Sequence, residues 1–89
     1  MKISYNEEEL RGEIMQYVPN GTRIDKASAT MKEHGFNCGD GQNNDAPLSV
    51  CEIKLKDGFP ASKWCQVLMY HDGQFVRKVD VYILGLYHR

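Results

Sequence analysis

Three cysteines are the residues of this sequence with the most evident chemistry: Cys38, Cys51 and Cys65. No two of them have the Cys-x-x-Cys spacing that is typical of dithiol redox sites and zinc knuckles. A zinc site built from His34 and the three cysteines would need four separate segments to converge. A Cys38–His34 nucleophilic pair lacks a third group to orient the histidine. The sequence therefore predicts no catalytic residue, no metal site and no cofactor, and a protein that is not an enzyme.

Cys38 and Cys51 are the candidates for a structural disulfide. A bridge between them would close the loop "GDGQNNDAPLSV", and cross-linking a loop of this length stabilises a fold by about 3 kcal/mol in the chain-entropy model. The bridge forms only in an oxidising compartment, which the sequence does not specify, so the oxidised and reduced states both stay open. Cys65 follows Trp64 in an expected strand and is interpreted as a small buried hydrophobic residue.

The charge balance argues against a nucleic-acid partner. The 89 residues hold 11 Lys and Arg against 12 Asp and Glu, a net charge of −1, whereas nucleic-acid binders carry a basic patch. No apolar stretch approaches the ~20 residues of a membrane span, and the N-terminal "MKISYNEEEL" lacks the hydrophobic run of a signal peptide. The expected location is the cytoplasm if the chain is complete, and the bacterial envelope or the exterior if a leader has been removed.

A first amphipathic helix is expected over residues 4–19. Asn6 and Glu9 have the spacing of a capping box, and three glutamates in the first turn suit the positive end of the helix dipole. Pro19 disfavours helical geometry for the residue before it, which ends the helix there. Apolar residues recur on one face, at Leu10, Ile14, Tyr17 and Val18.

A second helix follows the turn signal Asn20-Gly21. Thr22 is expected to cap it, with Asp25 at the partner position. Gly35 fits the left-handed residue that ends a helix, and Phe36 would fold back onto the last turn. The apolar stripe of this helix is short and consists of Ile24, Ala27 and Met31.

Three strands are expected after a polar, glycine-rich loop at residues 37–47. The runs 48–56 and 74–84 alternate apolar with charged residues, and a third run, 63–71, lies between them. Asp72-Gly73 is a strong signal for a two-residue hairpin turn. The sequence thus predicts one α+β domain, residues 1–89, in which two N-terminal helices pack on one face of a three-stranded antiparallel meander (ααβββ), as a two-layer sandwich.

The expected turn at Asp72-Gly73 decides which side chains share a face of the sheet. It groups the even-numbered residues from Trp64 to Tyr70 with the odd-numbered residues from Phe75 to Ile83, and this more apolar set is the expected core. A three-residue loop would shift the pairing and mix the two sets. The helix-free face is predicted to bind a partner, the alternative being the partly solvated face of a monomer. Its candidate contact residues are Met69, His71, Lys78 and Tyr82.

The segments "NGTRIDKASATMKEHGFNC", "LSVCE" and "WCQVLMYHDGQFVRKVDVYILGL" resemble the small domains of the BLIP/SmpA-OmlA type. The Gly21-Thr22 step matches the one that caps the second helix in such domains. An uncharacterised bacterial branch is similar in its "GF-x-C", its later strand cysteine and its "W…V…G-L" ending. The resemblance extends from about Leu10 to Leu86 and implies the ααβββ fold.

The same resemblance implies binding or scaffolding in the bacterial envelope rather than catalysis. The expected function is that of a non-enzymatic protein-binding, envelope-assembly or inhibitor-like module. Its partner is an unidentified protein or a second copy of the chain. The alternative is a small cysteine-dependent metal-binding or enzymatic protein, and elemental analysis with a thiol count would distinguish the two classes.

Overall fold

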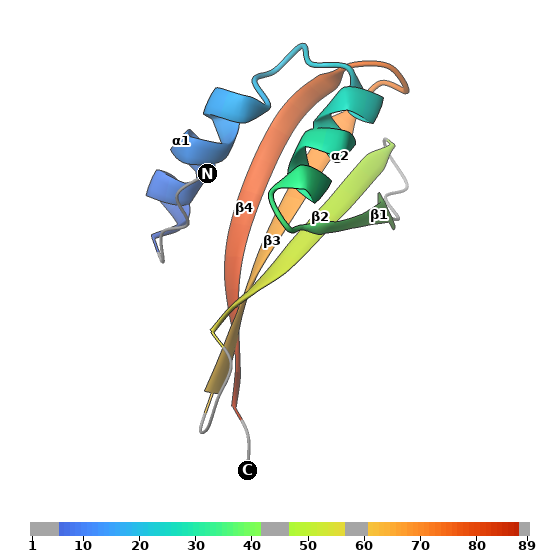
Figure 1. Cartoon of the computed structure of the whole chain (residues 1–89). Helices are drawn as coiled ribbons and strands as arrows, with labels where there is room; N and C mark the ends of the chain where they lie inside the picture. The colour runs from blue at the N-terminus through green and yellow to red at the C-terminus, as the bar shows by residue number, and fades with distance from the viewer. Residues whose placement is uncertain (1–5, 42–46, 57–60, 88–89) are drawn as a thin grey trace.

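The computed structural model describes residues 6–41, 47–56 and 61–87 of the chain. Within these ranges two helices are followed by four antiparallel strands, so the α+β class is confirmed (Figure 1). No helix in the same ranges is long and apolar enough to cross a membrane. The elements are α1 (Glu7–Tyr17), α2 (Ile24–Glu33), β1 (Asn37–Gly41), β2 (Leu48–Lys56), β3 (Ala61–His71) and β4 (Val76–Tyr87).

Helix α1 is capped as the sequence predicts. The Asn6 side chain accepts a hydrogen bond from the Glu9 amide at 3.0 Å, and the three acidic residues of the first turn lie at the positive end of the helix. Three of the four residues of the predicted stripe are buried. The exception is Tyr17, which is 39% exposed and meets the His34 ring edge-on. Residues 4 and 5 of the expected helix lie outside the described ranges.

Helix α2 starts without the predicted threonine cap. The Thr22 hydroxyl donates to the Pro19 carbonyl at 2.6 Å, and Arg23 is the residue that precedes the helix. The Thr22 carbonyl in turn accepts the Val76 amide at 2.8 Å, so Thr22 belongs to the connection between the helices and β4. A tertiary contact has therefore taken precedence over the local capping signal.

The end of α2 follows the prediction. Gly35 has φ +94°, in the left-handed region that glycine adopts without steric penalty. The Phe36 amide donates back to the Met31 carbonyl at 3.1 Å, and the Phe36 side chain is buried. This turn reverses the chain direction and leads it directly into β1.

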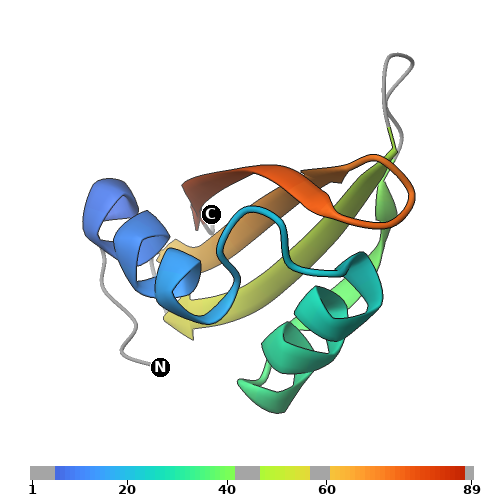
Figure 2. The same cartoon turned by 90° about the horizontal axis from the view of Figure 1, so that it is seen from above.

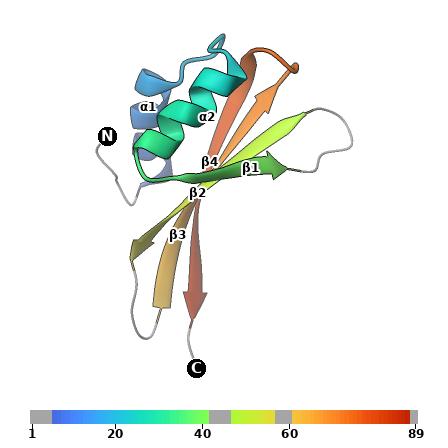
Figure 3. The same cartoon turned by 45° about the vertical axis from the view of Figure 1, so that its right-hand side comes forward.

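In the described parts of the chain, the sheet has four strands in the order β1-β2-β3-β4, and all neighbours are antiparallel. The predicted meander is present as β2, β3 and β4, but the prediction of three strands is wrong. Residues 37–41, expected as loop, form the edge strand β1 and pair with β2 (Figure 3). Its sequence, "NCGDG", has no strand propensity, so only the pairing with β2 makes it a strand.

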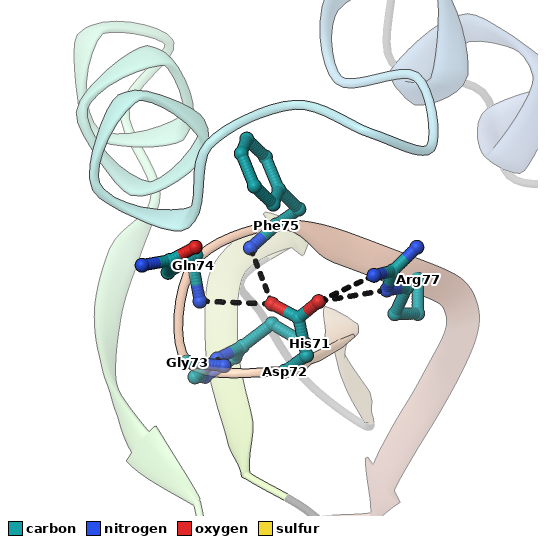
Figure 4. A network of polar contacts seen from close by, with 6 residues as sticks. All are labelled: His71, Asp72, Gly73, Gln74, Phe75 and Arg77. Atoms are coloured by element: carbon teal, nitrogen blue, oxygen red, sulfur yellow. Dashed lines mark hydrogen bonds and ion pairs between the residues drawn. The ribbon is translucent and has the colours of Figure 1, made fainter.

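The hairpin between β3 and β4 has a longer loop than the sequence predicts (Figure 4). Gly73 has φ +95°, and the Asp72 carboxylate accepts the amides of Gln74 and Phe75 at 2.9 and 2.7 Å. With a bulge between Tyr70 and His71, the loop moves the register by three residues, so that Met69 pairs with Val79 and not with Val76. Because the register shift is an odd number of residues, the side chains of β3 that share a face with a given set of β4 are the opposite ones from those predicted.

Both helices lie on the same side of the sheet (Figure 2). The core lies between the two helices and the sheet. Along each strand, side chains that point into the core alternate with side chains that point away from the helices. The core consists of Leu10, Ile14, Val18, Ala27, Met31 and Phe36 from the helical half and of Cys51, Cys65, Val67, Met69, Val76, Val79 and Val81 from the strands.

Helix α1 runs along the outer edge of β4. The Arg11 guanidinium donates through Nε to the Val79 carbonyl at 2.9 Å, and the Ile83 amide donates to the Glu7 carboxylate at 2.6 Å. These two side chains occupy backbone groups of β4 that face away from β3. An edge strand whose backbone groups are covered is protected against pairing with another chain.

Candidate binding surface

The side of the sheet that faces away from both helices is called the open face here. In the described residues it carries side chains from all four strands, because alternate residues of each strand point away from the core. Its positions are Asn37, Gly39 and Gly41 of β1, Leu48, Val50, Glu52 and Lys54 of β2, Trp64, Gln66, Leu68 and Tyr70 of β3, and Lys78, Asp80, Tyr82 and Leu84 of β4.

The register arranges these positions in four rows that run across the strands. The first row is Lys54–Trp64–Leu84, and the second is Asn37–Glu52–Gln66–Tyr82. The third is Gly39–Val50–Leu68–Asp80, and the fourth is Gly41–Leu48–Tyr70–Lys78. Each of the four rows therefore contains at least one apolar or aromatic side chain, and in the second row it is Tyr82 at the end.

The open face exposes large apolar side chains. Leu84 is 45% exposed and Tyr82 is 44% exposed, while Trp64, Leu68 and Tyr70 are partly exposed. The lower ends of β3 and β4 also extend past the helices (Figure 1). Several aromatic side chains thus share one solvent-facing surface. Aromatic residues are more frequent in protein–protein interfaces than on the rest of the protein surface.

Lysines lie over two of the aromatic rings. Lys54 Nζ is 5.3 Å from the centre of the Trp64 ring, and Lys78 Nζ is 5.7 Å from the centre of the Tyr70 ring. Lys78 also contacts the Asp80 carboxylate at 3.5 Å. The open face holds two lysines and two acidic residues, so it is amphipathic and balanced in charge.

A hollow of about 310 Å³ lies where β1 meets β2. It is lined by Asn37, Cys38, Gly39, Asp40, Val50 and Glu52. Gly39 is the reason for it, since this position faces Val50 and has no side chain. A Cβ atom added to Gly39 would meet no atom within 4 Å, so the space above the residue is open.

The cysteines serve the core rather than a reactive site. Cys38 and Cys51 are direct neighbours across β1 and β2, with Cα atoms 4.0 Å apart, and form a disulfide. Burial, with a smaller contribution from the nearby Glu7 carboxylate, raises the pKa of the Cys65 thiol to about 11. A thiol with this pKa is a poor nucleophile at neutral pH. Among the described residues, no group of three or more His, Cys, Asp and Glu could hold a metal ion.

The structure separates the four predicted contact residues. Lys78 and Tyr82 lie on the open face, as predicted. The placement of Met69 on that face is wrong, because the register shift turns its side chain into the core, where it is fully buried. His71 lies at the end of β3, half-buried, and its Nδ1 accepts the Gly73 amide at 3.0 Å, so it belongs to the hairpin.

Four residues of the open face were expected in the core: Trp64, Gln66, Leu68 and Tyr70. One signal in the sequence points to the right choice. The alternative residues of β3, namely Cys65, Val67 and Met69, form an uninterrupted apolar set, whereas Gln66 interrupts the set that contains Trp64. When only one face of a strand is buried, the uninterrupted apolar set is expected on the buried face.

In comparisons with known proteins, no family model, no curated protein and no solved structure matches the chain significantly. The resemblance to BLIP/SmpA-OmlA domains therefore stays a prediction.

Proposed function

We propose that this protein is a non-enzymatic protein-binding module whose binding surface is the open face. The observation that carries the proposal is the set of aromatic and aliphatic side chains, Trp64, Leu68, Tyr70, Tyr82 and Leu84, on the side of the sheet that neither helix covers. Exposed apolar patches that are bordered by polar residues mark interaction sites. The envelope-assembly or inhibitor role suggested by the BLIP/SmpA-OmlA resemblance is the expected setting.

The chemistry of the surface favours a protein as the partner. Tyrosine and tryptophan contribute much of the binding energy in protein interfaces, and here they stand among side chains of both charges. A nucleic-acid partner would need an excess of positive charge, and Lys54 and Lys78 are matched by Glu52 and Asp80. The Cys38–Cys51 disulfide supports an oxidising compartment, in agreement with an envelope or secreted protein.

The proposal is tested by capture of partners from an extract of the native host. The immobilised wild type is compared with Leu84→Asp, which places a charge on the open face. Phe75→Ser is the matched control, because Phe75 is a large hydrophobic residue of similar exposure, 38%, in the hairpin loop. We expect Leu84→Asp to reduce the captured amount of a specific protein at least tenfold, and Phe75→Ser to leave it unchanged.

The free energy of unfolding of each variant is measured in parallel. Substitutions at exposed positions usually change it by less than about 0.5 kcal/mol. Loss of capture at unchanged stability supports the proposal. Equal capture by the wild type and Leu84→Asp would refute it.

A further inference from the structure

We propose that the partner that occupies the open face is a second copy of this chain. The inference rests on the proposed function and specifies its partner. In the proposed dimer, the two open faces meet about a two-fold axis that runs parallel to the strands, between β2 and β3. Each β2 then lies over the partner's β3, and each β1 lies over the partner's β4.

This axis brings complementary side chains together in the centre of the interface. Because it keeps each row opposite the same row of the second copy, Val50 faces the partner's Leu68, and Leu48 faces the partner's Tyr70. Glu52 faces the partner's Gln66, which can donate a hydrogen bond to the carboxylate. Lys54 faces the partner's Trp64, a cation–π pair of the kind that each chain already forms internally.

The edges of the face also fit this arrangement. The charged open-face side chains of β4, Lys78 and Asp80, come to lie over the partner's Gly41 and Gly39. The space above Gly39 is open, whereas the Leu48 and Val50 side chains lean over Gly41. A two-fold axis across the strands would instead place Glu52 over the partner's Val50 and Lys78 over the partner's Leu84, so that both charged groups would face aliphatic side chains of the partner.

The hollow beside β1 provides a specific anchor point. Tyr82 projects from β4 in the row that contains Asn37, and the proposed axis directs it to the partner's hollow between Asn37, Gly39, Val50 and Glu52. The Asn37 and Glu52 side chains there offer oxygen atoms to the tyrosine hydroxyl. The two-fold symmetry repeats this contact, so each dimer contains two tyrosines in two hollows.

The size of the face places the proposed dimer among the weak or transient interfaces. Four strands about 4.8 Å apart and four rows about 6.8 Å apart cover roughly 500 Å² per copy, or roughly 1,000 Å² in the pair. This is at the lower limit of a specific interface, well below that of obligate dimers. We therefore expect a reversible dimer with a dissociation constant in the micromolar range.

The test measures the mass of the full-length protein by sedimentation equilibrium between about 1 µM and 1 mM, a range that brackets the expected constant. The single tryptophan, Trp64, lies on the open face, so its emission should shift to shorter wavelength as the dimer forms. The wild type should pass from monomer to dimer within this range. A monomer at every concentration would overturn the inference.

Gly39→Val is the decisive variant, because it fills the hollow while the monomer has room for the new side chain. Gly85→Val is the matched control: Gly85 is also a strand glycine without positive φ and with no atom near its added Cβ, but its position alternates with Leu84 toward the other side of the sheet. Gly39→Val should weaken the dimer at least tenfold, and Gly85→Val should leave it unchanged. Equal dimerisation of both variants would overturn the inference.

The two proposals fail in distinguishable ways. A wild type that stays monomeric, together with loss of host-protein capture by Leu84→Asp, overturns the dimer and leaves the binding function standing. A wild type that stays monomeric and captures nothing through the open face overturns both. If the wild type dimerises, and Gly39→Val and Tyr82→Ser each weaken the dimer, both proposals are supported.

Discussion

Asp72 is the residue that organises the β3–β4 hairpin. Its carboxylate accepts the amides of Phe75 and Gln74, and Arg77 Nε donates to its second oxygen at 2.9 Å (Figure 4). These hydrogen bonds, first those from the Phe75 and Gln74 amides and then that from Arg77, lower the pKa of Asp72 from 3.8 to about 2. A carboxyl group whose pKa is lower in the folded state stabilises the fold above its unfolded pKa.

The hairpin carboxylate should therefore give stability a pH dependence in acid. We expect Asp72→Asn to have a lower free energy of unfolding than the wild type at pH 7, because the amide lacks the charge that Arg77 and the two N–H groups favour. The difference should shrink as the pH falls from 3.8 towards about 2, where the wild-type carboxylate becomes protonated. Urea unfolding at a series of pH values measures it. A difference that stayed constant down to pH 2 would contradict the account.

Local residue signals were accurate where the interaction was local. Asn6 caps α1 and Gly35 ends α2, because each bond partner lies within a few residues along the chain. Thr22 has the same type of signal and does not cap α2, since its carbonyl pairs with Val76, which is distant in sequence. The outcome at Thr22 depends on how the helices meet the sheet, and a window of neighbouring residues does not contain that information.

At the scale of elements, β1 is the strand that depends most on a covalent link. Its residues include two glycines, an asparagine and an aspartate, which are all depleted in strands. Cys38 joins it to Cys51 in the adjacent strand, with 13 residues of sequence separation. The disulfide therefore holds a weak edge strand in the sheet, and with it the hollow beside Gly39.

Reduction of this disulfide should destabilise the protein substantially. We expect the free energy of unfolding to fall by about 3 kcal/mol in the presence of a thiol reductant, because the unfolded chain gains the freedom of the opened loop. Chemical unfolding with and without reductant measures the change. The double variant Cys38→Ser/Cys51→Ser is the control and should not respond to the reductant. A wild type that loses the bridge by intact mass but keeps its stability would contradict the prediction.

At the scale of the whole molecule, the two helices have different tasks. Helix α2 lies over β1 and β2, while α1 lies along β4 and covers its outer edge through Arg11 and Glu7 (Figures 1 and 2). The open face is thus available for binding while the β4 edge is guarded. Binding through side chains is favoured over binding by strand addition at this edge.

The guarded edge gives a prediction about dynamics. We expect the double variant Glu7→Ala/Arg11→Ala to increase hydrogen exchange of the Ile83 amide about tenfold, because a hydrogen bond to a charged group contributes about 1.5–3 kcal/mol. Aggregation at high concentration should rise as well, since backbone groups of an edge strand become available. Glu8→Ala, an exposed position on the same helical turn, serves as the control. Unchanged exchange at Ile83 would show that the helix does not protect this edge.

The sequence by itself determined the two helices, the meander of β2, β3 and β4, the position of the β3–β4 turn and which two cysteines could pair, but it left open the length of that turn and whether the disulfide forms. Each of these depends on patterns within one element or on the chemistry of one residue pair. Only the tertiary structure decided that β1 is a strand and that Trp64, Leu68 and Tyr70 lie on the open face. The physical reason is the two-residue period of side chains in a strand, which allows either face of β3 to be buried. The choice was made by one hairpin loop and by the core packed against the helices.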